Sequence, residues 1–171
     1  MRITGLFAVD ENGGMGKNNT IPWHIREDFL HFKATTMNQH VIMGSNTYYD
    51  LRDNYSKNGI VLPGRHIYVI SRKDGDGNVP FTNSVEEVIA HLSKHKIQQC
   101  FLIGGAQLLT SNTDIITDII VSKISGNFNC DVVLPIEFQE NKNVKIKNCS
   151  FSVTTITEKE NFRIIYASRS K

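Results

Sequence analysis

The feature that most constrains the fold is a repeated alternation of short apolar runs with segments of helical periodicity. The apolar runs are rich in β-branched residues and are bounded by Gly, Asn, Asp or Ser, as is typical of buried strands. We expect strands over residues 2–9, 39–43, 66–71, 99–103 and 118–124. Helices are expected over residues 24–37, 45–51 and 84–95, with a fourth after residue 105. This order predicts an α/β fold with a mainly parallel central sheet.

The C-terminal part of the chain has a different pattern. Two extended stretches flank residues 158–161, so we expect the chain to end in an antiparallel hairpin at the edge of the sheet. The mixed basic segment 143–150 is expected to be a surface loop. With no linker and no repeat in 171 residues, the prediction is a single domain over residues 1–171 with about four flanking helices.

Composition and charge exclude several classes of function. The 19 basic and 17 acidic residues give a net charge of +2 without any basic run, so nucleic acid is not an expected partner. Three cysteines without C-x-x-C spacing indicate reduced thiols. Because no secretory pattern and no membrane-spanning run occur, we expect a cytoplasmic protein that does not bind membranes. His91 and His95 have i, i+4 spacing but no third ligand, so no metal site is predicted.

Two segments are expected to be long irregular loops. One covers residues 10–21 and contains three glycines, and the other covers residues 52–64. Loops of about a dozen residues inside a compact domain are more often binding loops than spacers. The glycines would allow the first loop to move.

The segment PWHIREDFLHFK places a carboxylate beside an apolar helical face. At about 100° per residue, Asp28 falls on the side that carries Phe29 and Phe32, whereas Glu27 points away. Asp28 is then either a first-turn acid favoured by the helix dipole or the single carboxylate of an apolar pocket. In such a pocket, burial would raise the pKa of Asp28 and its oxygens could bind a polar heterocycle. These residues alone leave both interpretations open.

Six segments in the same order, AVDENGGMGKNNTIPW, EDFLHFK, VIMGSNTY, LPGR, VISR and IGGAQLL, together resemble dihydrofolate reductases. The resemblance extends from residue 2 to the terminal hairpin. It implies that a hydride passes from NADPH to C6 of 7,8-dihydrofolate and a proton to N5, giving the tetrahydrofolate of one-carbon metabolism and thymidylate synthesis. It also implies competition by antifolates, and we expect a monomer.

The resemblance assigns the substrate site. It makes Asp28 the carboxylate that binds the 2-amino group and N3 of the pteridine and that supports protonation of N5 by water passing a mobile loop at residues 13–19. Ser122 would support this carboxylate through its hydroxyl, and Trp23 would hold a water molecule. Arg65 would pair with the α-carboxylate of the glutamate tail through its planar guanidinium, whereas the alternative is an ordinary exposed loop arginine. The remaining substrate contacts, which overlap with helix and strand core, are Leu6, Ala8, Phe29, Phe32, Leu51 and Ile103.

The resemblance also assigns the cofactor site. Ser71 and Arg72 end a strand where a 2′-phosphate could bind, which favours NADPH over NADH. The segment FLIGGAQLL joins a strand to a helix start whose N–H groups suit a pyrophosphate, and the resemblance implies a cis bond between Gly104 and Gly105. The other cofactor contacts implied are Ala8, Met15, Gly16, Asn19, Gly44, Ser45, Asn46, Thr47, Ile103, Ala106, Gln107 and Leu108.

This chain departs from the family pattern at three positions that bear on cofactor affinity and on the rate of hydride transfer. Leu109 replaces a frequent tyrosine, Ser45 a frequent basic residue and Val132 a usual threonine. The segment from residue 47 to Arg65 is also longer than in compact bacterial members, so the resemblance does not assign the residues at the rim of the pocket. Two alternatives are an enzyme of the same fold that acts on another pteridine or a ribosyl-pyrimidine, and a non-catalytic nucleotide- or pteridine-binding protein. Arg65 favours folate, because a substrate without a glutamate tail does not need it.

Overall fold

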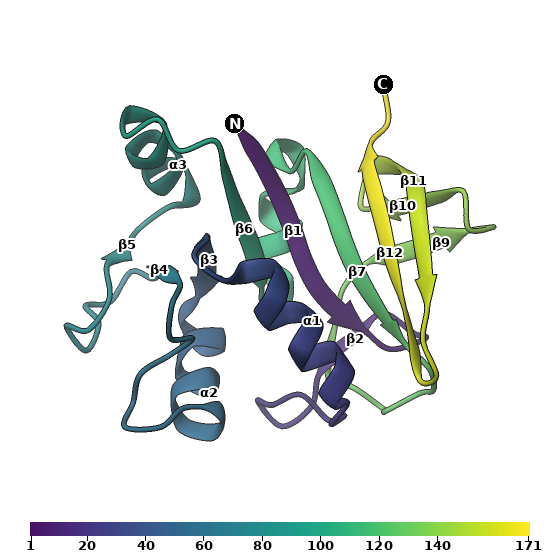
Figure 1. Ribbon diagram of the computed structural model, residues 1–171, viewed down its shortest axis with the longest axis horizontal. Coiled ribbons are helices and arrows are strands. Elements are labelled where there is room, and N and C mark those ends of the chain that lie inside the picture. Colours follow the sequence, from purple (N-terminus) through teal and green to yellow (C-terminus); the bar gives the residue numbers. More distant parts are fainter.

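A ten-stranded sheet forms the centre of the computed structural model, which describes residues 1–171 (Figure 1). Its strand order is β5-β4-β3-β6-β1-β7-β12-β11-β10-β9. Neighbouring strands from β5 to β7 are parallel, and neighbours from β7 to β9 are antiparallel. The predicted α/β class with a mainly parallel sheet is confirmed.

The parallel strands match the prediction closely. They are β1 (Arg2–Val9), β3 (His40–Gly44), β4 (His66–Ile70), β5 (Phe81–Thr82), β6 (Gln99–Gly104) and β7 (Asp118–Ile124). The five strands that the apolar runs predicted all form, whereas the short edge strand β5 was not predicted. Short apolar β-branched runs therefore identified the buried strands well, because each is covered on both faces.

The antiparallel part differs from the prediction in two respects. Its strands are β9 (Ile136–Gln139), β10 (Asn143–Ile146), β11 (Cys149–Glu158) and β12 (Phe162–Arg169). The β11–β12 hairpin is confirmed, but its expected place at the edge is wrong, because β12 pairs with β7 and the sheet continues through β10 and β9. The surface loop expected over residues 143–150 is also wrong. Val144 and Ile146 are buried on either side of exposed Lys145, an alternation typical of a strand that the lysines obscured.

The four helices are α1 (Arg26–Thr36), α2 (Ser45–Tyr55), α3 (Val85–Lys94) and α4 (Ala106–Ser111), and a 3-10 turn, η1, covers Thr113–Ile115. At the start of α3, Ser84 caps the helix, since the Glu87 N–H donates to Ser84 Oγ over 3.2 Å. In contrast, α2 continues to Tyr55 instead of ending near Leu51. None of the helices combines the length and apolar character that crossing a membrane requires.

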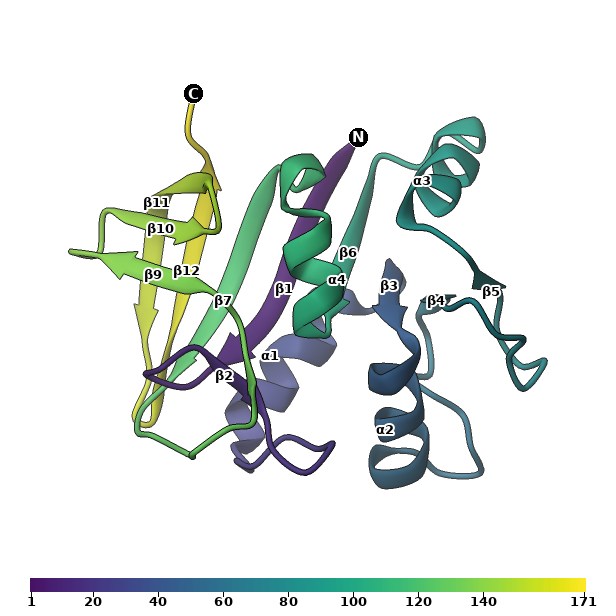
Figure 2. The same cartoon turned by 180° about the vertical axis from the view of Figure 1, so that it is seen from behind.

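The helices cover both faces of the sheet. Side chains of α1 and α2 pack in one apolar cluster with Leu6 and Ile103, and side chains of α3 and α4 pack in the other with Phe7 and Leu102. In Figure 1, α1 lies in front of the sheet, and in the reverse view of Figure 2, α4 does. Since side chains alternate along a strand, Leu6 and Ala8 of β1 face α1.

A group of histidine side chains lies where β3 and β4 begin, beside α3. The rings of His40 and His66 stack with centroids 4.5 Å apart, and His40 Nδ1 lies 3.2 Å from the Tyr68 hydroxyl. On α3, the ring of His91 lies 6.2 Å from that of Tyr68 and 4.5 Å from that of His95. No three His, Cys, Asp or Glu side chains are arranged to hold a metal ion. Burial lowers the pKa of His40, and the nearby His66 and His91 lower it further.

We expect His40 to make the fold less stable in mild acid. Because its pKa is lower in the folded chain than the ordinary value near 6.5, the stability it contributes is present above that value and is lost as the pH falls through the folded pKa. Replacing it in His40→Gln should therefore reduce the drop in melting temperature between about pH 7 and about pH 5. Thermal unfolding followed by circular dichroism measures this, with exposed His24→Gln as the control. Equal pH dependence in His40→Gln and the unmodified chain would contradict the assignment.

Candidate functional site

Asp28 and Ser122 connect α1 to the sheet. Ser122, which is 3% exposed, donates its hydroxyl to Asp28 Oδ1 over 2.6 Å. The strand register places Ser122 of β7 beside Ala8 of β1, on the face that α1 covers. The Asp28 carboxylate therefore points at the sheet. An acid that only stabilised the start of the helix would not need to point there.

Burial and two neighbours set the ionisation of Asp28. Burial raises the pKa of its carboxyl, while the Ser122 hydrogen bond and the charge of His31 oppose this rise. His31 lies one turn further along α1, and its Nε2 is buried without a hydrogen-bond partner. Burial lowers the pKa of His31, Asp28 raises it, and Lys159 lowers it. His31 was not among the expected site residues, although its i, i+3 spacing from Asp28 is a usable signal.

The apolar residues expected around the site come together. Trp23 is 4% exposed and packs edge to face on Phe128, with ring centroids 5.4 Å apart and an interplanar angle of 64°. It shares one apolar cluster with the expected wall residues, which are Leu6, Ala8, Phe32, Leu51 and Ile103. Elements distant in sequence thus supply a continuous apolar wall on the α1 face of the sheet. Asp28 approaches the same face through Ser122.

Phe29 lies outside this cluster and is 37% exposed. Its ring lies 5.9 Å from the ring of Tyr55, the last residue of α2. The Tyr55 hydroxyl lies 3.4 Å from Thr20 Oγ1 in the glycine-containing loop. Tyr55 was not among the expected site residues, because α2 was expected to end before it. The unusual length of this segment was the available signal.

Arg65 is half-buried beside a cavity of about 520 Å³ that Tyr48 and Ile67 also line. Its Nε donates to the Leu62 carbonyl over 3.2 Å, but its Nη1 is buried without a partner. Burial lowers the pKa of the guanidinium. A buried N–H without an acceptor is costly, so this side chain is suited to an anionic group that would complete its hydrogen bonds.

Two turns at the carboxyl ends of β3 and β6 lie against each other. A Cβ built on Gly44 would lie 3.7 Å from the Gly104 carbonyl oxygen, and one on Gly105 would lie 3.7 Å from Thr47 Oγ1. The Gly104–Gly105 bond is cis, as expected. Met15 joins this group, because its Cε lies 3.5 Å from the Cβ position of Gly104.

The two helices that start at these turns differ from the other two. Neither α2 nor α4 has an acidic residue in its first turn, and, as in α1, no side chain caps their N-termini. By contrast, α1 and α3 each carry two acidic residues there. Free N–H groups without nearby carboxylates favour an external anion, so this end of the sheet fits a phosphate-bearing cofactor. The expected contacts that these turns and helix starts carry are Gly44, Ser45, Asn46, Thr47, Gly104, Gly105, Ala106, Gln107 and Leu108.

Ser71 and Arg72 follow the end of β4. The register pair Gly44–Ile70 places them next to the start of α2. Arg72 is exposed, and the Ser71 hydroxyl accepts the Lys73 N–H over 3.1 Å. A hydroxyl and a free guanidinium thus extend the same end of the sheet with groups suited to a phosphate.

The loop over residues 10–21 is more ordered than the glycines suggested. Its β2 (Gly14–Gly16) pairs with β8 (Val132–Val133), which includes the exposed Val132. The Asp131 N–H donates to the Gly16 carbonyl over 3.0 Å, and Asn19 adopts a left-handed conformation with φ 63°. The expectation of an irregular loop is therefore wrong for residues 14–16, and cofactor contacts of Gly16 and Asn19 stay predictions.

Asp10 anchors this loop. It is 1% exposed, and its carboxylate accepts the N–H groups of Asn12, Gly14 and Phe128 over 2.9, 2.8 and 3.0 Å. Burial opposes ionisation, but these hydrogen bonds lower the pKa of Asp10 below its ordinary value. A Cβ on Gly14 would lie 2.5 Å from Cys130 Cβ, so only glycine fits there. Asp10 was not among the expected residues, although an acid between a strand and a glycine-rich loop was the available signal.

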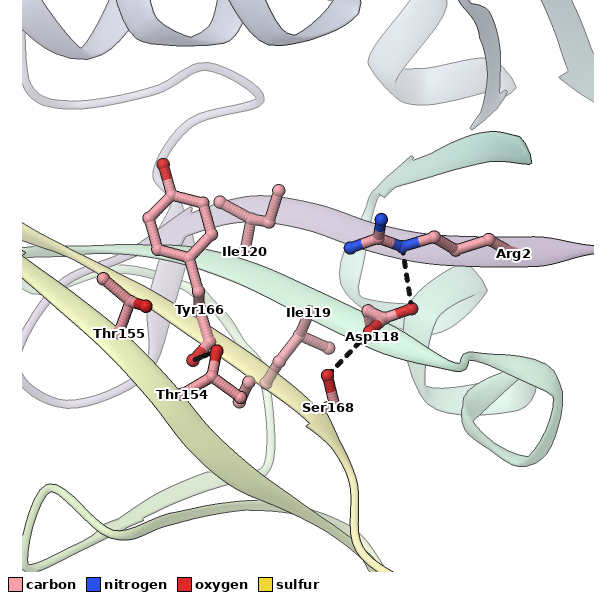
Figure 3. A pocket seen from close by; sticks show the side chains of 9 residues that line it. Arg2, Asp118, Ile119, Ile120, Thr154, Thr155, Tyr166 and Ser168 are labelled. Carbon is pink, nitrogen blue, oxygen red and sulfur yellow. Dashed lines mark hydrogen bonds and ion pairs between the residues drawn. The ribbon is translucent and has the colours of Figure 1, made fainter. Parts of the chain in front are cut away.

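A separate pocket of about 190 Å³ opens near the start of β7 (Figure 3). Its charged groups pair with one another, since Arg2 Nε lies 3.1 Å from Asp118 Oδ2 and the Ser168 hydroxyl donates to Asp118 Oδ1 over 2.8 Å. None of the residues expected at the site lines it. Because its charged side chains already pair with each other, this pocket is not a candidate site.

Comparison with known proteins gives one consistent family. A family model described as dihydrofolate reductase matches residues 2–169. The dihydrofolate reductase of Bacillus subtilis (strain 168) is 34% identical over 140 residues, which cover 81% of this chain and 77% of that protein. The dihydrofolate reductase of Mycoplasma pneumoniae is 29% identical over 147 residues, covering 80% and 84% of the two chains. Another M. pneumoniae protein, named segregation and condensation protein A, is 30% identical over 165 residues; the match covers 96% of this chain but only 29% of that protein.

We expect Ser122→Ala to raise the pKa of Asp28 further. The Ser122 hydroxyl donates to the ionised carboxylate, and removing it leaves the effect of burial less opposed. The carboxyl carbon shift of Asp28 in protein labelled with ¹³C-aspartate, followed by NMR across a pH titration, measures this change. Ser125→Ala, at an exposed position near the end of β7, is the control. A titration of Asp28 that stays in place, or moves to lower pH, would show that Ser122 does not set its ionisation.

Proposed function

The chain belongs to the dihydrofolate reductase family, whose members reduce 7,8-dihydrofolate to 5,6,7,8-tetrahydrofolate with NADPH, and we propose that it does so with Asp28 as its single active-site carboxylate. The observation that supports this most is the half-buried Asp28 carboxylate, which Ser122 holds at an apolar wall. The proposal places the whole reaction in one domain over residues 1–171. Its product serves one-carbon metabolism and thymidylate synthesis.

Asp28 binds and orients the pteridine in this proposal. Its ionised carboxylate accepts hydrogen bonds from N3 and the 2-amino group, while Leu6, Ala8 and Phe32 contact the flat ring. The donors of the substrate offset the cost of burying this charge. Burial raises the pKa of Asp28 because it makes the charged carboxylate costly without a positive partner. The carboxylate therefore favours the positive charge that develops at N5 when that atom is protonated.

Water delivers the proton to N5 in this proposal. The chain offers no second acid in the expected site, so Trp23 and the loop that Asp10 anchors would control the access of water. Bound NADPH supplies the hydride. The residues around it, Met15, Ile103 and the Gly104–Gly105 turn, hold the reacting faces together and exclude bulk solvent.

Arg65 and Arg72 bind the two anionic ends of the ligands in this proposal. The unpartnered Nη1 of Arg65 donates to the α-carboxylate of the glutamate tail. Arg72, with Ser71, binds the 2′-phosphate, while the starts of α2 and α4 hold the pyrophosphate. Both ligands then meet at the carboxyl ends of the parallel strands, where α/β sheets bind ligands.

Further aspects of the proposal concern partners and location. Antifolates should compete for the Asp28 site, as they do in the family. Action as a monomer in the cytoplasm, without nucleic acid or membrane partners, stays a prediction.

The decrease of NADPH absorbance at 340 nm tests the reaction directly. Protein mixed with NADPH and dihydrofolate should consume the cofactor, and omission of dihydrofolate should stop the decrease. A flat trace from folded protein that still binds NADPH would overturn the proposal in favour of a non-catalytic binding protein of the same fold.

We expect Asp28→Asn to lower turnover at neutral pH by about 100-fold or more, because an amide neither carries the charge nor accepts both pteridine donors. NADPH affinity should stay nearly the same, since the variant leaves both helix starts intact. Steady-state assays and fluorescence titration with NADPH measure the two quantities. Equal loss of both would contradict the role of Asp28.

We expect Arg72→Ala to weaken NADPH binding by about tenfold and NADH binding by less than about twofold, because only NADPH carries the 2′-phosphate. Titrations of both nucleotides measure the ratio, and Lys145→Ala, on exposed β10, controls for a general loss of positive charge. An unchanged preference would remove Arg72 from the phosphate site.

A further inference from the structure

A histidine lies beside the carboxylate that the proposed function uses. His31 has i, i+3 spacing from Asp28 on α1, and residues at this spacing are neighbours on the surface of a helix. The His31 side chain is half-buried, and its Nε2 is buried without a hydrogen-bond partner. Because no hydrogen bond holds this nitrogen in one protonation state, the ring can gain a proton there.

Asp28 has no other neighbour that offsets its burial with a positive charge. The Ser122 hydroxyl that donates to its carboxylate is neutral, and none of the ion pairs of the chain includes Asp28. The nearby Lys159, in the turn between β11 and β12, instead pairs with Glu27, whose Oε2 lies 4.0 Å from Lys159 Nζ. A positive charge beside Asp28 can therefore come only from His31.

The protonation of the two residues is coupled. Burial raises the pKa of Asp28, while the Ser122 hydrogen bond and the charge of His31 lower it. Burial lowers the pKa of His31, Asp28 raises it and Lys159 lowers it, and the net result is a pKa below the ordinary value of 6.5. His31 therefore gains its charge in mild acid, and that charge favours the ionised form of Asp28 as protonation begins to threaten it.

We propose that His31 is a positioning residue that keeps the Asp28 carboxylate ionised in mild acid, and thus able to bind the pteridine. This inference rests on the proposed function, in which the ionised carboxylate accepts the hydrogen-bond donors of the substrate. His31 acts through Asp28 and not on the substrate itself. The first proton that the pair takes up in acid resides on the imidazole, and the carboxylate keeps its charge.

Two substitutions at this position separate the effect of charge from a structural effect. His31→Gln stays polar but cannot gain a charge, so Asp28 should titrate at higher pH than in the unmodified chain. His31→Lys carries its charge throughout, and its flexible side chain can reach solvent, so Asp28 should titrate at lower pH. NMR measures both titrations through the carboxyl carbon shift of Asp28 in ¹³C-aspartate-labelled protein. Exposed His24→Gln is the control and should leave the titration in place.

Binding of dihydrofolate in the presence of NADP⁺, which has no hydride to transfer, measures the consequence for the site. We expect His31→Gln to bind dihydrofolate within about twofold of the unmodified chain at about pH 7.5, and about fivefold more weakly than that chain at about pH 5.5. His31→Lys should bind it in acid at least as well as the unmodified chain. Fluorescence titration measures these affinities, and circular dichroism checks that each variant is folded.

The outcomes separate this inference from the proposed function. If the unmodified chain binds dihydrofolate but does not consume NADPH, the proposed function fails, and the NMR titrations still decide whether His31 keeps Asp28 ionised. If both variants move the Asp28 titration in the same direction, or neither moves it, His31 has only a structural role and the inference is overturned. Protonation of Asp28 at higher pH than the His31 ring in the unmodified chain would also overturn it.

Discussion

The hydrogen bond between Ser122 and Asp28 is the contact on which the arrangement of the site depends. It connects the first turn of α1 to the centre of β7, and thereby fixes which side of α1 faces the sheet. The same orientation brings Phe32 into the apolar cluster and leaves Phe29 at the margin beside α2. A carboxylate that burial makes costly is stable there because a hydroxyl is aimed at it and His31 lies nearby.

Acidic residues are distributed unevenly over the starts of the four helices. Acidic residues occupy the first turns of α1 and α3, and none occupies those of α2 and α4. The two helices without acidic first turns start from adjacent turns, whereas α1 presents a carboxylate to the sheet. In the proposed function, one end of the sheet thus binds a phosphate beside a heterocycle that donates hydrogen bonds.

The sequence predicted the parallel core because buried strands leave a local signal of apolar, β-branched residues. Apolar runs located β1, β3, β4, β6 and β7, and the family pattern located Asp28 and Ser122, which the structure places in contact. The sequence pattern did not indicate β10, because Lys145 and the neighbouring polar residues obscured the alternation of buried and exposed side chains. Nor did it predict the buried role of Asp10 or the reach of Tyr55, because both depend on contacts with distant segments, Phe128 and Phe29. Long-range pairing of this kind leaves little trace in a local pattern.

The central place of β12 has a consequence for the order in which the protein can fold during synthesis. Ser122 pairs in register with Ile164, so β7 has a neighbour on only one side until Phe162–Arg169 has left the ribosome. Until then, the edge of β7 has unpaired N–H and C=O groups, and such edges invite pairing with other chains. The part of the sheet that carries Ser122 is consequently completed late in translation. Nascent chains that stall before this point would be prone to aggregate.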